Sequence, residues 1–176
     1  MTYFSKFPQI TYDFTVKSDP SKITETFTDL TTKVMMFISD QDLENLCFHY
    51  TIKGSELPEN ISQTYYSTPE LAWTITYINK IGNLSTDWPL SDIELLNYVS
   101  NKYGISNIYS IHHYVKTPEN VVMDQSYIIS QYGSQYALPV TNLDYETSIN
   151  EYKRMIYLIK PEYITSFVNN YFNQLV

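Results

Sequence analysis

The stretch Phe48-His49-Tyr50-Thr51-Ile52-Lys53-Gly54-Ser55 decides the fold of the middle of the chain. Its first five residues are rich in aromatic and β-branched side chains, a composition typical of a β-strand. The Lys53-Gly54-Ser55 tripeptide that follows is typical of a turn. We therefore predict a short strand over residues 48–52 that turns at once into the next element.

Two helix starts follow this turn. Pro58 suits the first turn of a helix over residues 57–66, on which Ile61 and Tyr65 lie four positions apart on one face. Thr68-Pro69-Glu70 combines an N-cap hydroxyl, a proline at the first helical position and an acid near the positive helix end. It predicts a second helix that ends near Asn79.

The second helix carries two apolar faces. One is formed by Leu71, Ile75 and Ile78, and the other by Trp73 and Tyr77. A helix of this length buries one stripe in its own domain. We therefore expect the face of Trp73 and Tyr77 to meet a partner, with a place in the core as the alternative.

The sequence before the strand gives weaker signals. Residues 1–20 alternate aromatic residues with polar residues and prolines, which favours an extended arm over a helix. Residues 21–47 are rich in threonine, and their period does not separate helix from strand. Within them, residues 33–39 favour a strand.

Residues 80–141 contain one well-marked helix. Ser91 and Glu94 form a capping box, and Gly104 ends the helix that they begin. Residues 108–115 and 137–141 are then predicted as strands. The polar residues 117–135, with scattered tyrosines, are predicted as an irregular excursion.

The C-terminal region is predicted as a strand over residues 153–159 and a helix that begins at Pro161. The helix has an apolar stripe with helical spacing that continues to the last residues, so we expect it to dock on the body or on a partner. The stripe consists of Ile164, Phe167, Val168, Tyr171, Phe172 and Leu175.

Length and composition fit one compact domain, or one small domain with long arms, and the predicted helices and strands make the fold α+β. The chain has 176 residues, of which 43% are hydrophobic and only 17% charged. We expect an N-terminal arm and connecting segment over residues 1–47, a central domain with its following helix over 48–104, and further strands with a terminal helix over 105–176. Eighteen tyrosines favour interfaces, although a bias in base composition explains such an excess equally well.

The charge of the chain excludes several classes of partner. A net charge of −8, with ten lysines and the single arginine Arg154, argues against nucleic acids and against anionic membranes. The longest unbroken apolar run, residues 34–38, is far too short to span a bilayer. The N-terminus lacks the pattern of a secretory signal, so we expect the protein to stay where it is made. The single Cys47 has no internal disulfide partner.

A search for reactive groups predicts neither an enzyme nor a cofactor or metal site. The adjacent His112 and His113 should point to opposite faces of a strand, and Cys47 with His49 supplies too few ligands for zinc. No nucleophile motif or phosphate-binding loop is present in the sequence. The acids Glu56, Glu59, Glu70 and Asp87 leave glycoside cleavage open, but each is more simply a helix-start acid or a solvated charge. Trp88, beside Asp87, is either a sugar-stacking group or a buried loop anchor.

The strand, turn, helix, helix order over residues 48–80 resembles the LysM module, a small βααβ unit. A longer pattern resembles the LysM-containing baseplate wedge subunit of T-even-like contractile-tailed bacteriophages. Ser67, where glycine is expected, and the looser approach at residues 83–85 depart from that family. The pattern comprises Tyr3-Phe4-Ser5-Lys6-Phe7-Pro8, Tyr50-Thr51-Ile52-Lys53-Gly54-Ser55, Pro58-Glu59-Asn60-Ile61-Ser62, Tyr65-Tyr66, Pro69-Glu70-Leu71-Ala72-Trp73, Asn79, Asp87-Trp88-Pro89-Leu90, Lys102-Tyr103-Gly104, His112-His113-Tyr114 and residues 150–161.

The resemblance implies a structural virion protein of the phage tail, assembled in the host cytoplasm, without catalysis. The family clamps a helical core bundle of other baseplate wedge proteins and lies near the sheath initiator and the adjacent wedge, in a six-fold assembly around a hub. LysM-type binding of peptidoglycan or chitin is the alternative function. The residues expected to dock partners are Trp73, Tyr77, Trp88, Phe4, Phe7 and Phe172.

Overall fold

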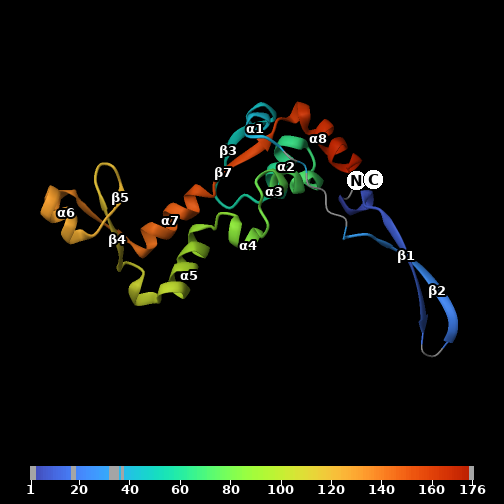
Figure 1. Cartoon of the computed structure of the whole chain (residues 1–176), viewed down its shortest axis with the longest axis horizontal. Coiled ribbons are helices and arrows are strands. Elements are labelled where there is room, and N and C mark those ends of the chain that lie inside the picture. The colour runs from blue at the N-terminus through green and yellow to red at the C-terminus, as the bar shows by residue number, and fades with distance from the viewer. Residues whose placement is uncertain (1–2, 17–18, 32–35, 37, 175–176) are drawn as a thin grey trace. The chain divides into compact units, whose positions relative to one another are not determined.

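The computed structural model describes residues 3–16, 19–31, 36 and 38–174 of the chain (Figure 1). Helices alternate with small separate sheets, which confirms the predicted α+β class. The elements are η1 (Tyr3–Lys6), β1 (Gln9–Val16), β2 (Asp19–Thr28), α1 (Asp40–Leu46), β3 (Cys47–Thr51), α2 (Pro58–Tyr66), η2 (Pro69–Leu71), α3 (Ala72–Ile78), α4 (Leu84–Asp87), α5 (Asp92–Tyr103), η3 (Ile105–Asn107), β4 (Ile111–Lys116), β5 (Val121–Val122), α6 (Gln125–Tyr132), η4 (Ser134–Tyr136), β6 (Ala137–Thr141), α7 (Asn142–Tyr152), β7 (Met155–Ile159) and α8 (Pro161–Asn173).

These elements form two compact units. Unit 1 comprises Met1–Tyr50, Glu56–Gly82 and Ile156–Val176, and unit 2 comprises Thr51–Ser55 and Asn83–Met155. The chain therefore leaves unit 1, builds most of unit 2 and returns. This grouping differs from the predicted sequential segments because β7 pairs with β3 from the opposite end of the chain.

The pairing of β3 with β7 completes a β-α-α-β arrangement with α2 and α3. The Lys160 N–H donates to the Leu46 carbonyl at 3.0 Å, and the Ile52 N–H donates to the Arg154 carbonyl at 2.9 Å. Rising residue numbers in one strand thus meet falling numbers in the other, so the two strands are antiparallel. The predicted strand, turn and two helices occur at the expected places, but the closing strand follows only after the residues of unit 2.

Both helices of this arrangement are hydrogen-bonded to the closing strand. The Asn79 side chain, at the end of α3, donates to the Tyr157 carbonyl and accepts from the Tyr157 N–H, each at 2.8 Å. The Tyr66 hydroxyl, at the end of α2, donates to the Ile159 carbonyl at 2.9 Å. These bonds give β7 polar partners in addition to β3.

The core of unit 1 lies among β3, β7, α3 and α8. Its buried apolar cluster consists of Cys47, Ile78, Ile159, Ile164 and Phe167. The predicted stripe of α8 is confirmed for Ile164, Phe167 and Tyr171, which are buried, and for Val168 and Phe172, which are half-buried. Leu175 lies outside the described residues.

Local sequence signals placed several boundaries correctly. The helix predicted over residues 57–66 is α2, and Ser67 ends it in a left-handed conformation at φ 60°. The second predicted helix is divided into η2 and α3, and the Thr68 hydroxyl accepts from the Glu70 N–H as expected. The capping box of α5 is reciprocal: Ser91 N–H donates to the Glu94 carboxylate at 3.0 Å.

The arm predicted over residues 1–20 is extended in β1, as expected, but it also contains the short helix η1. The prediction did not include the antiparallel pairing of β1 with β2, which lies mostly in the following segment. Of the strand predicted over residues 33–39, only Met36, Ile38 and Ser39 are described and none lies in a strand; the others lie outside the described residues. Ser39 instead caps α1, a helix that was not predicted.

In unit 2 the prediction missed the single-turn helix α4 and two longer helices. The region 117–135, predicted as irregular, contains β5 and α6. Asp124 is the N-cap of α6, and its carboxylate accepts from the Tyr127 N–H. Thr141 caps the other longer helix, α7. In both helices the apolar residues show only a weak helical period. The capping residues alone were therefore not enough to predict a helix from the sequence.

Of the three strands predicted after residue 104, two are confirmed and one is shifted. The strand over residues 137–141 is β6, and the one over 108–115 is the shorter β4, because Ile108 follows η3. The strand over 153–159 is β7. No helix in the described part of the chain has the length and apolar composition needed to cross a membrane.

Leu158→Ala tests the dependence of the fold on β7. Leu158 is fully buried, so we expect its truncation to lower the free energy of unfolding by ~2 to 5 kcal/mol, measured by urea denaturation. Met155→Ala on the same strand is the matched control, because Met155 is 65% exposed. An equal loss for both variants would contradict the assigned burial.

Candidate docking surfaces

An aromatic cluster lies where η1, α3 and α8 meet in unit 1. Trp73 is at its centre, with its ring centroid 4.6 Å from Tyr171 and 4.9 Å from Tyr3. Tyr77 contacts the Tyr171 ring edge-on at 5.1 Å. Aromatic pairs with such separations and tilts stabilise a core beyond the area that they bury. We call Tyr3, Phe7, Trp73, Tyr77, Tyr171 and Phe172 the aromatic cluster.

Hydroxyl groups fix the geometry of this cluster. The Tyr3 and Tyr171 hydroxyls are hydrogen-bonded at 2.7 Å, and the Tyr77 hydroxyl accepts from the Met36 N–H at 2.8 Å. Burial, followed by the bond to Tyr3, raises the pKa of Tyr171 above its usual range. The polar ends of all three tyrosines therefore have partners inside the unit.

The predicted second face of α3 is thus occupied by the chain itself. Trp73 and Tyr77 are half-buried, and Phe167 and Tyr171 of α8 pack against them. This packing agrees with the core alternative for Trp73 and Tyr77, and docking of a partner by them stays a prediction. The apolar stripe of α8 packs on this face of α3, so each helix covers apolar side chains of the other.

The other predicted docking residues divide between surface and core. Phe4 is 57% exposed, whereas Phe7 and Phe172 are half-buried at the edge of the aromatic cluster. Trp88 lies in unit 2 and is only 5% exposed, which fits the buried-anchor alternative and not a surface contact. The structure thus brings five of the six predicted residues to one region of unit 1 and leaves Trp88 outside it.

A hollow of about 300 Å³ adjoins the exposed side of the aromatic cluster. Its wall is mixed, with apolar rings beside a lysine, a glutamate and two asparagines. The lining residues are Tyr3, Lys6, Thr68, Glu70, Leu71, Trp73, Val168, Asn169, Phe172 and Asn173. An opening of this size accommodates one or two side chains of a partner protein.

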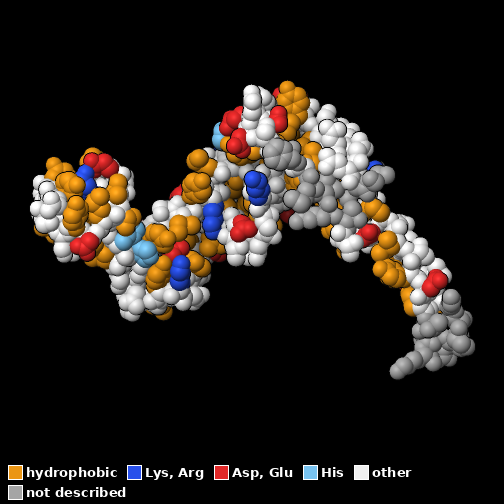
Figure 2. All heavy atoms as spheres, viewed as in Figure 1, with side chains coloured by type: hydrophobic (Ala, Val, Ile, Leu, Met, Phe, Trp, Pro, Cys, Tyr) orange, Lys and Arg blue, Asp and Glu red, His pale blue; other side chains and the backbone are white. Residues whose placement is uncertain are grey.

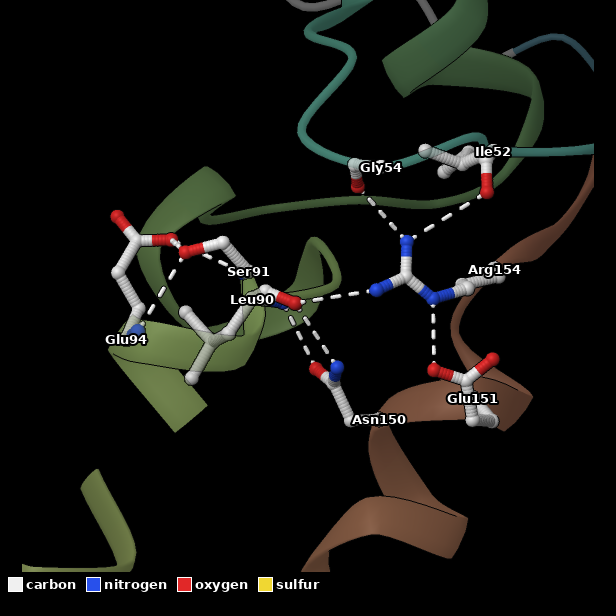
Figure 3. Close-up of polar contacts among 8 residues, drawn as sticks. All are labelled: Ile52, Gly54, Leu90, Ser91, Glu94, Asn150, Glu151 and Arg154. Carbon is white, nitrogen blue, oxygen red and sulfur yellow. Dashed lines mark hydrogen bonds and ion pairs between the residues drawn. The ribbon is translucent and has the colours of Figure 1, made fainter. Parts of the chain in front are cut away.

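Arg154 joins three segments of unit 2 (Figure 3). Its guanidinium donates to the carbonyls of Gly54 at 2.9 Å and Leu90 at 3.3 Å, and Nε donates to the Glu151 carboxylate at 2.8 Å. Arginine suits this role because its rigid fork presents several donors in fixed directions. The only arginine of the chain therefore serves to hold the backbone and is already engaged.

Asn150 completes this network from the preceding turn of α7 (Figure 3). Its side chain accepts from the Leu90 N–H at 2.7 Å and donates to the Leu90 carbonyl at 2.9 Å. Asn150 is 3% exposed, so loss of its amide would take away the partner of the Leu90 N–H and leave the Leu90 carbonyl with Arg154 alone. Asn79 contacts Tyr157 in the same two-bond manner in unit 1.

A buried carboxylate links α5 and α7. Glu146 is 5% exposed and accepts from Lys102 Nζ and from the Tyr103 hydroxyl, both at 2.7 Å. Burial alone would raise the pKa of Glu146, but these two hydrogen bonds outweigh burial and hold the pKa below its ordinary value. The same contact raises the pKa of Lys102. This pair is consistent with a structural ion pair.

The two adjacent histidines meet on one side of β4, contrary to prediction. Their Nδ1 atoms are 2.8 Å apart, and the His112 ring stacks on Tyr145 at 4.0 Å. The strand is irregular between Ile111 and His113, where two residues oppose one on β6, so the usual alternation of side chains is lost. Among the described residues, no group of three or more His, Cys, Asp or Glu side chains could hold a metal ion.

Other residues weighed for chemistry have local structural roles. Burial raises the pKa of the Cys47 thiol to about 11, so it is not a thiolate at neutral pH. The Tyr50 hydroxyl donates to Glu56 at 2.7 Å, and Asp87 accepts from the Asn83 N–H at 2.9 Å. Glu59 and Glu70 lie in first helical turns, as the simpler interpretation expected.

Comparison with known proteins gives no family for this chain. No protein-family model matches it, and no curated protein matches it either.

Trp73→Ala tests whether the aromatic cluster is part of the core of unit 1. Because Trp73 is half-buried among five other rings, we expect its truncation to lower the free energy of unfolding by roughly 2 to 4 kcal/mol in urea denaturation. Phe4→Ala is the control, with a much smaller loss expected from its 57% exposure. Unchanged stability in Trp73→Ala would return this face to the partner-docking interpretation.

Glu146→Gln tests the buried carboxylate through pH. The folded pKa is lowered, so the charge stabilises the fold above the unfolded pKa, and this contribution is lost as pH falls through the folded pKa. We expect the wild type to exceed the variant in stability at pH 7 and the difference to shrink towards pH 3. Urea denaturation across this range measures it, with the exposed Glu162→Gln as control. A difference independent of pH would contradict the assignment.

Proposed function

We propose that this chain is a non-catalytic connector in the baseplate wedge of a contractile phage tail. In this role it clamps other wedge proteins and links neighbouring wedges around the hub. The sequence resemblance supplies the identity of the assembly. The surface of the molecule supports a connector more generally.

The observation that carries the proposal is that both units expose large apolar side chains (Figure 2). In unit 1, Tyr12 and Phe14 of the hairpin are exposed, and in unit 2, Ile105 and Tyr109 are more than two-thirds exposed. Exposed apolar surface beyond scattered single residues marks sites of protein–protein contact. A chain with such surface on two separate units is suited to hold two partners together.

The internal architecture also supports a scaffold role. The β-α-α-β arrangement of β3, α2, α3 and β7 agrees with the LysM-like module that the resemblance implies. Its polar groups are used for internal ties, as Asn79 and Tyr66 illustrate. The partners proposed from the resemblance are the helical core bundle of the wedge, the sheath initiator and the adjacent wedge.

Co-expression with the other wedge proteins of its phage tests the proposal. We expect a stable complex on size-exclusion chromatography and wedges that fail to close into rings when this chain is omitted. If the chain stays free and rings close without it, the connector role is wrong. Sedimentation of the free chain with peptidoglycan, or its binding to chitin oligomers, would instead favour the LysM-type glycan-binding alternative.

A further inference from the structure

The β1–β2 hairpin is amphipathic. Cross-strand neighbours share a face, and the register pairs Ile10 with Phe27, Tyr12 with Glu25 and Phe14 with Ile23. The Tyr12 and Phe27 rings are 6.3 Å apart on this face. We call these six residues the hairpin face: five are apolar and one is acidic.

The opposite face of the hairpin is polar. Its pairs include Thr11 with Thr26 and Asp13 with Thr24, and the Thr24 hydroxyl donates to the Asp13 carboxylate at 2.8 Å. Threonine favours strands without adding a large apolar surface. The two faces therefore differ in chemistry while both keep the extended backbone.

The hairpin face remains largely uncovered in this chain. Tyr12 is 58% exposed, Phe27 45%, Phe14 40% and Ile23 37%. On β1 the face runs from Ile10 to Phe14, and at roughly 3.3 Å per residue it presents an apolar strip about 13 Å long. A two-stranded ribbon is marginally stable alone in water, because neither strand can bury its apolar face against the other. The strip gains stability only when another surface covers it.

Charge identifies the kind of surface that would cover it. Glu25 lies at the middle of the hairpin face, between the Ile10–Phe27 and Phe14–Ile23 pairs. Face-to-face packing of two copies would bring two Glu25 carboxylates together inside an apolar contact, and each chain already carries a net charge of −8. Like charges in such a contact are strongly unfavourable. A second copy is therefore a poor occupant, and a basic group opposite Glu25 is a good one.

We propose that the hairpin face docks on another protein through an apolar surface that presents a lysine or arginine to Glu25. This inference rests on the proposed connector function and assigns one of its contacts. Tyr12, Phe14 and Phe27 supply the apolar anchors, since exposed aromatic side chains contribute most where an interface excludes water. Glu25 sets the register and excludes acidic surfaces.

Binding of the full chain to the co-expressed wedge proteins tests the inference. The double variant Phe14→Thr with Phe27→Thr keeps strand-forming residues and removes two anchors, and we expect it to bind more than ten-fold more weakly. Thr11→Gln with Thr26→Gln is the matched control on the opposite face and should bind as the wild type does. Equal binding by the wild type and the Phe14/Phe27 variant overturns the inference and leaves the connector function standing.

Charge variants give a second measurement that does not depend on removal of the anchors. Glu25→Lys should weaken binding more than Glu25→Gln, and binding of the wild type should weaken more steeply with salt than that of Glu25→Gln. Equal affinities and equal salt dependence overturn the proposed basic group.

Two further outcomes separate the inference from the function on which it rests. If the wild type itself does not join the wedge proteins, the connector function fails and the inference falls with it. If the free wild type forms dimers in analytical ultracentrifugation and the Phe14/Phe27 variant does not, a second copy covers the hairpin face and the inference is wrong.

Discussion

Pairing between β3 and β7 is the constraint on which unit 1 depends. The strands lie more than a hundred positions apart in the sequence, and most of unit 2 lies between them. Their pairing therefore closes a long loop. The entropy of closing so long a loop grows slowly with its length, and burial of Ile156, Leu158 and Ile159 offsets it. The two bonds from Asn79 to Tyr157 then attach α3 to the strand that closes the unit.

In both units, asparagine side chains form the two hydrogen bonds that a neighbouring strand would otherwise form with a backbone segment. Asn79 and Asn150 each pair with both backbone groups of one distant residue, and Arg154 holds carbonyls of two further segments. Such contacts satisfy backbone groups that small sheets leave without partners. A chain with few charged residues and no disulfide available can in this way hold irregular segments in place.

The distribution of apolar surface separates stability from the proposed docking role. The rings of the aromatic cluster stabilise unit 1 from within, whereas those of the hairpin face remain exposed on a ribbon that cannot cover them. The same residue types thus serve different purposes according to whether a second element of the chain reaches them. In the proposed connector, Glu25 makes the otherwise apolar hairpin face selective for a partner with a basic group.

Local signals in the sequence determined where many elements begin and end, because caps, prolines and short apolar periods act over a few residues. They located β3, α2, α5, β6 and α8, and the alternation of residues 9–16 indicated the extended backbone of β1 but not its partner. Tertiary structure alone decided which strand closes the β-α-α-β unit, that α8 covers Trp73 and Tyr77, and that a bulge brings His112 and His113 together. Those outcomes depend on contacts between distant segments, and no local pattern specifies which buried surface meets which.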